Sequence, residues 1–186
     1  EIAKSPTFHV PIIDSASYDQ HARLLVEKGI FYQRFFWQGF LYPFFLAVLY
    51  FFTGGSMLWA RLIQILLGSI LCVLVHRLGV RLFDRRTGAV AGAIAALYGP
   101  LIFYDAELLD TGLSAVWAIV LVLLVLKARD AKGAWTAALV GVCGGLSVVT
   151  RATFLPYLVV ACGWLLFAWR ARSVRPALVA ARGGLI

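Results

Sequence analysis

Acidic residues are scarce in this chain, and three of its nine lie together where a long apolar run ends. Asp105, Glu107 and Asp110 stand within seven residues of otherwise apolar sequence. Ionisable groups at such a boundary are costly and often functional. Because a helix points residues two apart in different directions, we expect only one of Asp105 and Glu107 to face a given cavity, and we favour Glu107. The alternative is a solvated loop that caps the next helix through Asp110 or Thr111.

A further carboxylate and two arginines border other apolar runs. Asp14 follows Pro11-Ile12-Ile13 at the head of a polar segment, where it either serves a site or is an N-cap or helix-dipole carboxylate. Arg61 lies four residues into the apolar run that begins at Met57, and Arg151 lies in a short connection between two such runs. Each arginine either snorkels to lipid head groups or pairs with an anion in a cavity.

The composition indicates that membrane-spanning helices position these side chains. Of the 186 residues, 62% are hydrophobic before glycine is counted and 14% are charged, and the mean hydropathy is +0.87. Soluble domains have roughly 45–50% apolar residues with glycine included and about 25% charged residues. A soluble globular domain, a disordered chain and a disulfide-rich secreted domain are therefore excluded. In lipid every backbone polar group needs an internal partner, so we predict an all-α, polytopic transmembrane helical bundle.

Two regions are expected within this single membrane domain. Residues 1–56 are predicted to form an extracytoplasmic loop with interfacial helices. An amphipathic helix over 15–28 would begin at a capping box of Ser17 and Gln20 and end at Gly29. The 13 apolar residues 40–52 are too short for a hydrocarbon core of ~30 Å, which predicts a re-entrant or interfacial segment.

Residues 57–186 are predicted to form a transmembrane bundle of about five spans. The predicted spans are 57–75, 89–103, 112–126, 134–149 and 154–169. Two pairs of glycines with four-residue spacing, Gly88/Gly92 and Gly141/Gly145, are typical of helices that approach each other closely in membranes. The sequence is interpreted as a fragment of a longer protein.

The positive charge of the chain predicts its orientation in the membrane. A net charge of +8 can indicate a nucleic-acid partner, but here the basic residues concentrate in short segments between or after apolar runs. That distribution marks the cytoplasmic side, so no nucleic-acid partner is expected. Residues 1–38 and 104–111 would then share the extracytoplasmic face. The basic segments are 77–86, 127–132 and 170–182.

Several motifs occur in an order that resembles a known family. These are Pro11-Ile12-Ile13-Asp14 with Tyr18, Gly39-Phe40-Leu41-Tyr42-Pro43, Arg61 with Gln64, Ala96-Leu97-Tyr98-Gly99-Pro100, and Phe103-Tyr104-Asp105-Ala106-Glu107. Together they resemble GT-C glycosyltransferases, in particular the bacterial protein O-mannosyltransferase and aminoarabinose-transferase group, which is glycosyltransferase family 39-like. The resemblance covers essentially the whole chain. It implies an enzyme of a bacterial inner membrane whose active site is extracytoplasmic.

The resemblance implies a reaction and roles for the candidate residues. A sugar would pass from a polyprenyl-phosphate donor to an acceptor hydroxyl of a protein, lipid or glycan by inverting displacement. Asp14 matches the catalytic aspartate of the family and would act as the general base, with Glu107 as a second catalytic residue. Arg61 and Arg151 would bind the donor phosphate, and the supporting candidates are Tyr18, Tyr42 and Asp105.

Three points stay open at this level. A divalent metal, Mg²⁺ or Mn²⁺, held by Asp14 and Glu107 could replace an arginine at the donor phosphate. Protein mannosyltransferases have Asp-Glu where this chain has Asp14-Ser15, which leaves the acceptor class undecided. The competing function is a non-catalytic membrane protein, either a transporter module or a structural subunit.

Overall fold

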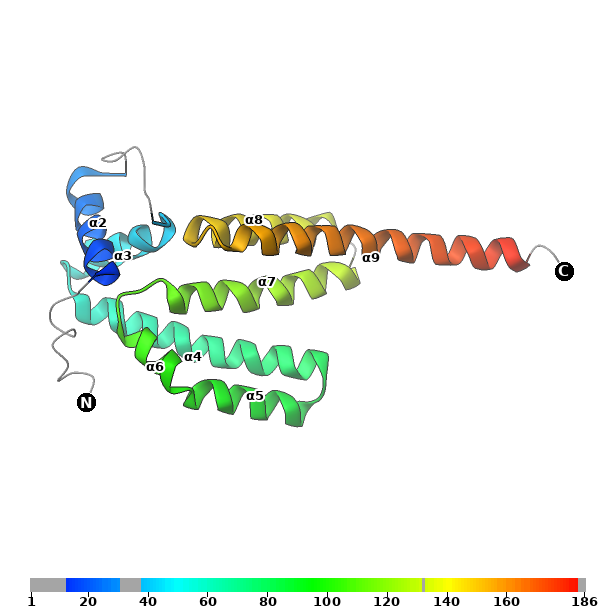
Figure 1. The fold of residues 1–186 in the computed structure, drawn as a ribbon, viewed down its shortest axis with the longest axis horizontal. Helices are drawn as coiled ribbons and strands as arrows, with labels where there is room; N and C mark the ends of the chain where they lie inside the picture. The colour runs from blue at the N-terminus through cyan, green and yellow to red at the C-terminus, as the bar shows by residue number, and fades with distance from the viewer. Residues whose placement is uncertain (1–12, 31–37, 132, 184–186) are drawn as a thin grey trace.

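The protein is an all-helical bundle, as the composition predicts. A computed structural model describes residues 13–30, 38–131 and 133–183, and these contain no β-strand (Figure 1). The helices are α2 (Asp14–Lys28), α3 (Leu41–Thr53), α4 (Met57–Leu82), α5 (Arg85–Leu97), α6 (Gly99–Ala106), α7 (Thr111–Ala131), α8 (Ala134–Thr150) and α9 (Phe154–Gly183).

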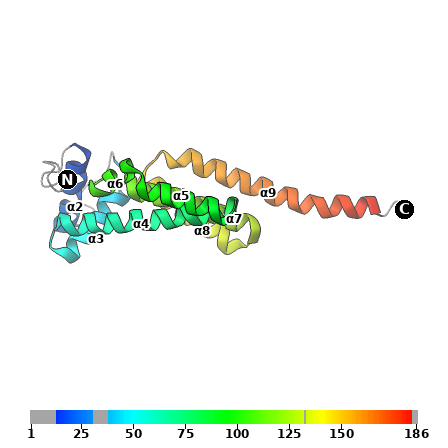
Figure 2. The same cartoon turned by 90° about the horizontal axis from the view of Figure 1, so that it is seen from below.

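Helices α4, α5, α7, α8 and α9 run along the long axis of the bundle (Figures 1 and 2). Helix α4 packs on α5 and α7, and α7 packs in turn on α8 and α9. Helices α2 and α3 pack on each other at one end, together with the connections 54–56, 107–110 and 151–153. We call this the α2 end. The described residues of the N-terminal segment and the 107–110 loop therefore share one end, as predicted from the sequence.

Among the described residues, two helices are long and apolar enough to cross a membrane. Helices α4 and α7 have 26 and 21 residues, each with a mean hydropathy of 2.2 over its most apolar stretch. Helices α5 and α6 meet these criteria only when taken together, which brings the number of candidate membrane spans in the described residues to at most three. Helix α3, helix α8 and the apolar part of α9 are shorter, with 13 to 17 residues. At about 1.5 Å per residue, α3 covers roughly 20 Å, so its predicted non-spanning role fits its length.

The predicted continuous span over 89–103 is wrong. Helix α5 ends at Leu97 and α6 begins at Gly99, and the two axes differ by 52°. Tyr98 between them is extended, with φ −73° and ψ 102°. Pro100 explains the break, since proline inside a helix removes one hydrogen bond and clashes with the preceding turn but fits a first turn well.

The glycine spacing predicts one helix contact correctly and misses another. A Cβ on Gly88 would lie 2.7 Å from the His76 carbonyl oxygen, and one on Gly92 would lie 3.0 Å from the His76 Cβ, so these glycines bring α5 against α4. A Cβ on Gly141 or Gly145 would meet no described atom within 4 Å. Gly144 instead faces Leu158, so α8 meets α9 through a glycine that the spacing did not indicate.

Helix α2 is held by its packing and not by the predicted capping box. Its N-cap is Ile13, with φ 53° and no side-chain cap, while Gly29 ends it with φ 80° as expected. Its apolar face packs against α3. One polar contact adds to this packing, in which the Tyr50 hydroxyl donates to Asp19 Oδ1 at 2.6 Å. Arg23 forms an ion pair with Asp19 at 2.9 Å rather than with Glu27, the next acidic residue of the helix. The residues buried between the two helices are Tyr18, Ala22, Leu25, Tyr42, Leu46, Ala47 and Tyr50.

Candidate active site

A cavity of about 490 Å³ lies at the α2 end. Four segments that are far apart in the sequence form its wall: Tyr18 of α2, residues 38–40 before α3, Asp110 before α7, and residues 148–153 at the end of α8. The first two segments belong to α2 and to the start of α3 at this end, and the other two lie where α7 begins and α8 ends at the same end. Gly39 permits the closest approach, because a Cβ at this position would collide with the Thr150 carbonyl oxygen.

Asp110 and Arg151 form an ion pair in this wall. Arg151 Nη2 donates to Asp110 Oδ1 at 3.0 Å, and Ser114 Oγ donates to Asp110 Oδ2 at 3.5 Å. The Asp110 side chain is 3% exposed and the Arg151 side chain 49% exposed. Burial raises the pKa of the Asp110 carboxyl, and the charge of Arg151 and its hydrogen bond act against that shift. Asp110 therefore orients a guanidinium that still reaches the cavity and solvent.

Tyr18 lies among the charged groups of the site. Burial raises the pKa of its hydroxyl to about 12; the negative charges of Asp110 and Asp14 add to the shift, and the positive charge of Arg151 opposes it. The Tyr18 ring packs edge-on against the ring of Tyr42, with centroids 4.8 Å apart. At neutral pH Tyr18 therefore presents a protonated hydroxyl, which can donate a hydrogen bond to an oxygen in the cavity.

Asp14 reaches the cavity through Gln38. It is the first residue of α2 and is exposed, and Gln38 Nε2 donates to its Oδ1 at 3.3 Å. Ser17 Oγ donates to Gln38 Oε1 at 3.0 Å, which fixes the orientation of this amide. Gln38 itself lines the cavity. Asp14 is not the N-cap, because Ile13 holds that position and no side chain caps the helix. Its place in the first turn of α2 fits the alternative role of a carboxylate that interacts with the helix dipole.

Arg61 and Glu107 lie together on the α4 side of the α2 end. Arg61 is buried on α4 and interacts electrostatically with the Glu107 carboxylate. Gln64, one turn further along α4, donates to the backbone oxygens of Glu107 and Leu109 at 2.9 and 3.3 Å. Tyr42 donates to Gln64 Oε1 at 3.1 Å. Helices α3 and α4 thus hold the 107–110 loop in place through a buried polar chain.

The structure divides the predicted site residues into groups. Tyr18 and Arg151 line one cavity, and Asp14 is linked to it through Gln38. Glu107 lies near enough to Arg61 to interact with its charge, and Asp105 lies apart on α6. A cavity shared by Asp14 and Glu107 stays a prediction. In the part of the chain that the structure describes, no group of three or more His, Cys, Asp or Glu side chains could hold a metal ion.

Sequence reasoning gave too little weight to two residues of this site. Asp110 was considered only as a cap, and its partner Arg151 is 41 residues away, so no local pattern links the two. Gln38 gives no local signal at all. An acidic residue directly before a long apolar helix, with an arginine in the connection after the next helix, is the pattern that could have indicated the pair.

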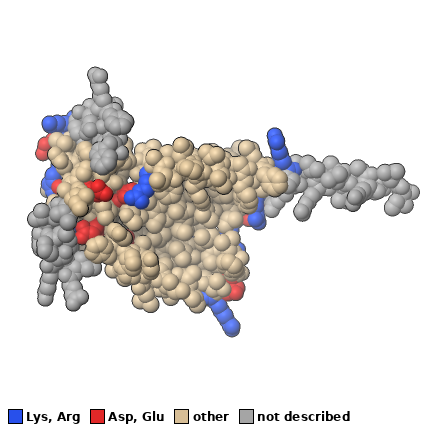
Figure 3. Space-filling view, viewed as in Figure 1, with Lys and Arg blue, Asp and Glu red and all other residues tan. Residues whose placement is uncertain are grey.

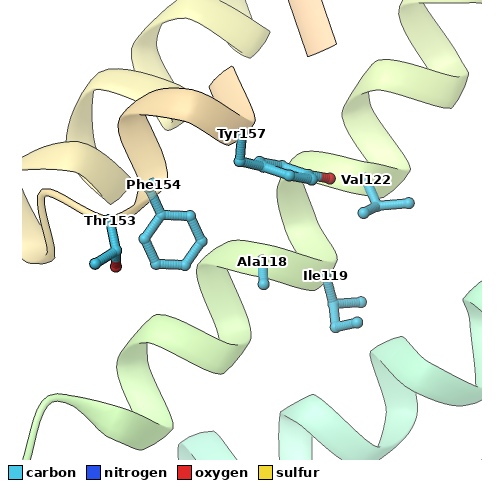
Figure 4. Close-up of a pocket in the computed structure, with 6 residues that line it drawn as sticks. All are labelled: Ala118, Ile119, Val122, Thr153, Phe154 and Tyr157. Atoms are coloured by element: carbon cyan, nitrogen blue, oxygen red, sulfur yellow. The ribbon is translucent and has the colours of Figure 1, made fainter. Parts of the chain in front are cut away.

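An apolar pocket of about 270 Å³ adjoins the charged cavity (Figure 4). This apolar pocket lies between α7 and the start of α9. Thr153 lines both the apolar pocket and the charged cavity. Figure 4 shows Phe154 and Tyr157 of α9 facing Ala118 and Ile119 of α7. Polar and apolar binding spaces therefore lie next to each other at the α2 end.

Comparison with known proteins identifies the family. Residues 38–186 match the family of dolichyl-phosphate-mannose-protein mannosyltransferases. The chain belongs to this family. The match includes Arg61, Glu107, Asp110 and Arg151 and begins after Asp14. No curated protein and no solved structure shows a significant match to the chain.

Family membership confirms the resemblance read from the motifs and sets the general activity. The chain is an integral membrane protein with a glycosyltransferase fold of the mannosyltransferase type. Enzymes of this class move a sugar and require a nucleophile, a leaving group and a means to stabilise its charge. The cavity at the α2 end contains one exposed cation, the guanidinium of Arg151, and the hydroxyl of Tyr18.

Proposed function

We propose that this chain transfers a sugar, in the first instance mannose, from a polyprenyl-phosphate donor to an acceptor hydroxyl in the cavity at the α2 end. The observation that carries the proposal is the position of Arg151, held by buried Asp110 beside Tyr18 and Gln38 in a cavity that adjoins an apolar pocket. A lipid-linked sugar phosphate needs this combination of cation, hydrogen-bond donors and apolar space.

Asp14 acts as the general base in the proposed mechanism. Its exposed carboxylate accepts the proton of the acceptor hydroxyl as that oxygen attacks the anomeric carbon. The bond from the anomeric carbon to the phosphate oxygen breaks in the same displacement, and the configuration of the sugar inverts. The hydrogen bond from Gln38 holds Asp14 Oδ1, which leaves Oδ2 for the acceptor.

Arg151 stabilises the leaving polyprenyl phosphate. The negative charge on the phosphate grows as the sugar departs, and an oriented guanidinium offers two parallel N–H donors to it. Tyr18 adds a hydroxyl donor from α2. Arg61 on α4, which interacts electrostatically with Glu107, is proposed as a second cation for the donor phosphate. Thr153 lines both spaces and marks where the first isoprene units would pass from the charged cavity into the apolar pocket.

The α2 end is proposed to face the outside of a bacterial inner membrane. Figure 3 shows most of the acidic side chains at the α2 end. Basic residues predominate at the opposite end, where Arg81 and Arg129 both bond to Asp130, at 2.8 and 3.1 Å. An excess of Lys and Arg at one end supports a cytoplasmic location for that end.

A transfer assay tests the proposal. The full-length protein, reconstituted in liposomes, is given radiolabelled polyprenyl-phosphate mannose and a serine- and threonine-rich acceptor peptide or a glycolipid acceptor. We expect label in one acceptor, with the anomeric configuration inverted. A protein that uses a nucleotide sugar equally well, or transfers nothing to either acceptor, contradicts the proposal.

The same assay distinguishes Arg151 from a divalent metal. If arginine stabilises the leaving phosphate, prior treatment with EDTA leaves the rate unchanged. A rate that EDTA abolishes and added Mg²⁺ or Mn²⁺ restores supports a metal held by Asp14 and Glu107 instead.

A further inference from the structure

A separate cavity of about 390 Å³ lies where α4, α5 and α6 meet. Its wall shares no residue with the cavity around Tyr18 and Arg151. Ile65 and Ile102 in this wall are each about half exposed, so the cavity opens on the outer surface of the bundle. Its volume lies in the range of ligand sites, ~300–1,000 Å³.

Asp105 is the acidic group of this cavity. Its residue surface is only 7% exposed, and its Oδ1 has no hydrogen-bond partner among the described residues. A Cβ on Gly112 would lie 2.7 Å from Oδ1, and one on Gly68 would collide with Oδ2. Two glycines on two different helices thus make room for a carboxylate that no described cation pairs with.

An isolated carboxylate in apolar surroundings is unfavourable unless a cation or a hydrogen-bond donor pairs with it. The neighbouring wall residues of α4, α5 and α6 are mostly aliphatic, with the Ser69 hydroxyl and the Cys72 thiol as the other polar groups. Ser69 already donates to the backbone oxygen of Ile65 at 3.0 Å. A ligand with a compact positive group and an apolar body would complement this cavity.

The ligand set disfavours a metal ion here. Mg²⁺ and Ca²⁺ bind six or more oxygen ligands, often from several carboxylates. The described residues offer no group of three or more metal-ligating side chains at this or any other position. An ammonium group, in contrast, needs only one carboxylate as its counter-charge.

We propose that this cavity binds an amphiphilic primary amine, with its ammonium on Asp105 and its apolar part between Ile65, Ala95 and Ile102. Asp105 lies two residues before Glu107, so the ammonium would lie near the α2 end while the apolar part extends toward the bilayer. The ethanolamine head group of a membrane lipid and a soluble alkylamine both present this chemistry. The opening on the outer surface of the bundle favours the lipid.

Calorimetric titration of the full chain in detergent with n-octylamine tests the proposal, with n-octanol as the uncharged probe. We expect octylamine to bind the wild-type protein and octanol to bind at least tenfold more weakly. Asp105→Asn should weaken octylamine binding at least tenfold. Ala95→Phe, which fills the cavity, should do the same, while Ala93→Phe, exposed on the same helix, should not.

Equal octylamine affinity in wild type and Asp105→Asn, or equal affinity of octanol and octylamine, overturns the proposal. If Asp105→Asn fails to fold, an equal loss of octylamine affinity in Ala95→Phe and Ala93→Phe overturns the proposal as well. Native mass spectrometry in mixed phosphatidylethanolamine and phosphatidylcholine micelles identifies the source. If the wild-type protein retains phosphatidylethanolamine and Asp105→Asn does not, the site binds the lipid. If the wild-type protein binds octylamine but retains no phosphatidylethanolamine, the site binds a soluble amine.

Discussion

Asp110 and Arg151 depend on each other in different ways. Asp110 is buried, so its charge needs the guanidinium, while Arg151 is half exposed and uses the carboxylate mainly for orientation. Removing one partner of such a pair leaves a buried charge unsatisfied, which costs about 1–3 kcal/mol or more. Removing both charges avoids that penalty.

This asymmetry predicts different effects on folding and on catalysis. Arg151→Ala should lower the melting temperature and slow transfer by about 10²-fold or more, since one donor to developing charge is lost. Adding Asp110→Asn to Arg151→Ala should recover much of the melting temperature without recovering activity. Thermal melting and initial transfer rates measure the two effects. Recovery of activity in the double variant would contradict a direct role for Arg151.

The Tyr18 hydroxyl gives a prediction about alkaline pH. Its pKa of about 12 in the folded protein lies above the ordinary value of 10. Between these two pH values the folded state therefore retains a proton that the unfolded state loses. The stabilisation is complete below pH 10 and is lost as the pH rises toward 12. The melting temperature of the wild type should therefore fall more steeply between pH 10 and 12 than that of Tyr18→Phe. Parallel curves would place the Tyr18 hydroxyl in an ordinary aqueous environment.

At the scale of elements, the site depends on the close approach of residues 38–40 to the end of α8. Gly39 makes this approach possible, because any side chain would meet the Thr150 carbonyl oxygen. Gln38, which joins Asp14 to the cavity, is the neighbouring residue. A displacement of this segment would separate Asp14 from Arg151 without touching either side chain.

We therefore expect Gly39→Ala to slow transfer by about 10²-fold, the effect of a displacement of roughly 1 Å at a catalytic group. Gly99→Ala is the matched control, because a Cβ there meets nothing within 4 Å and the residue has no positive φ. Transfer rates and melting temperatures of both variants measure the effect. Equal activity of the two variants would show that the 38–40 segment does not position the site.

The sequence allowed the helices to be predicted more fully than their contacts. Helices α4 and α7 follow from apolar runs, and Gly29 follows from local turn chemistry. The break at Tyr98 was missed because the hydrophobic run continues through Gly99-Pro100, and apolar periodicity outweighed the local effect of proline. Gly144 was missed because residue spacing alone does not tell which face of a helix meets its neighbour.

The site was predictable only in part, for a similar reason. Asp14, Tyr18 and Arg151 were candidates because their types and positions near apolar runs are unusual. The ion pair of Asp110 with Arg151 joins residues 41 positions apart, and the bond from Gln38 to Asp14 joins residues 24 apart. Pairings over these separations come from the packing of whole helices, which a single sequence does not specify.

For the whole molecule, the proposal requires that the α2 end faces the outside of the membrane. After replacement of Cys72, Cys143 and Cys162 by alanine, Gln20→Cys at the α2 end and Arg86→Cys at the opposite end provide two exposed positions. A membrane-impermeant maleimide should label Gln20→Cys in intact cells and Arg86→Cys only after lysis. The reverse pattern would place the cavity on the cytoplasmic side and contradict the proposed donor orientation.

The central claim is that Asp14 removes the proton from the acceptor hydroxyl, and a single-turnover transfer rate tests it most directly. Asp14→Asn preserves the shape of the side chain but cannot accept the proton, so transfer should slow by about 10²–10⁴-fold with an unchanged melting temperature. Glu27→Gln, an exposed carboxylate on the same helix, should transfer at the wild-type rate. Wild-type transfer by Asp14→Asn would contradict the account.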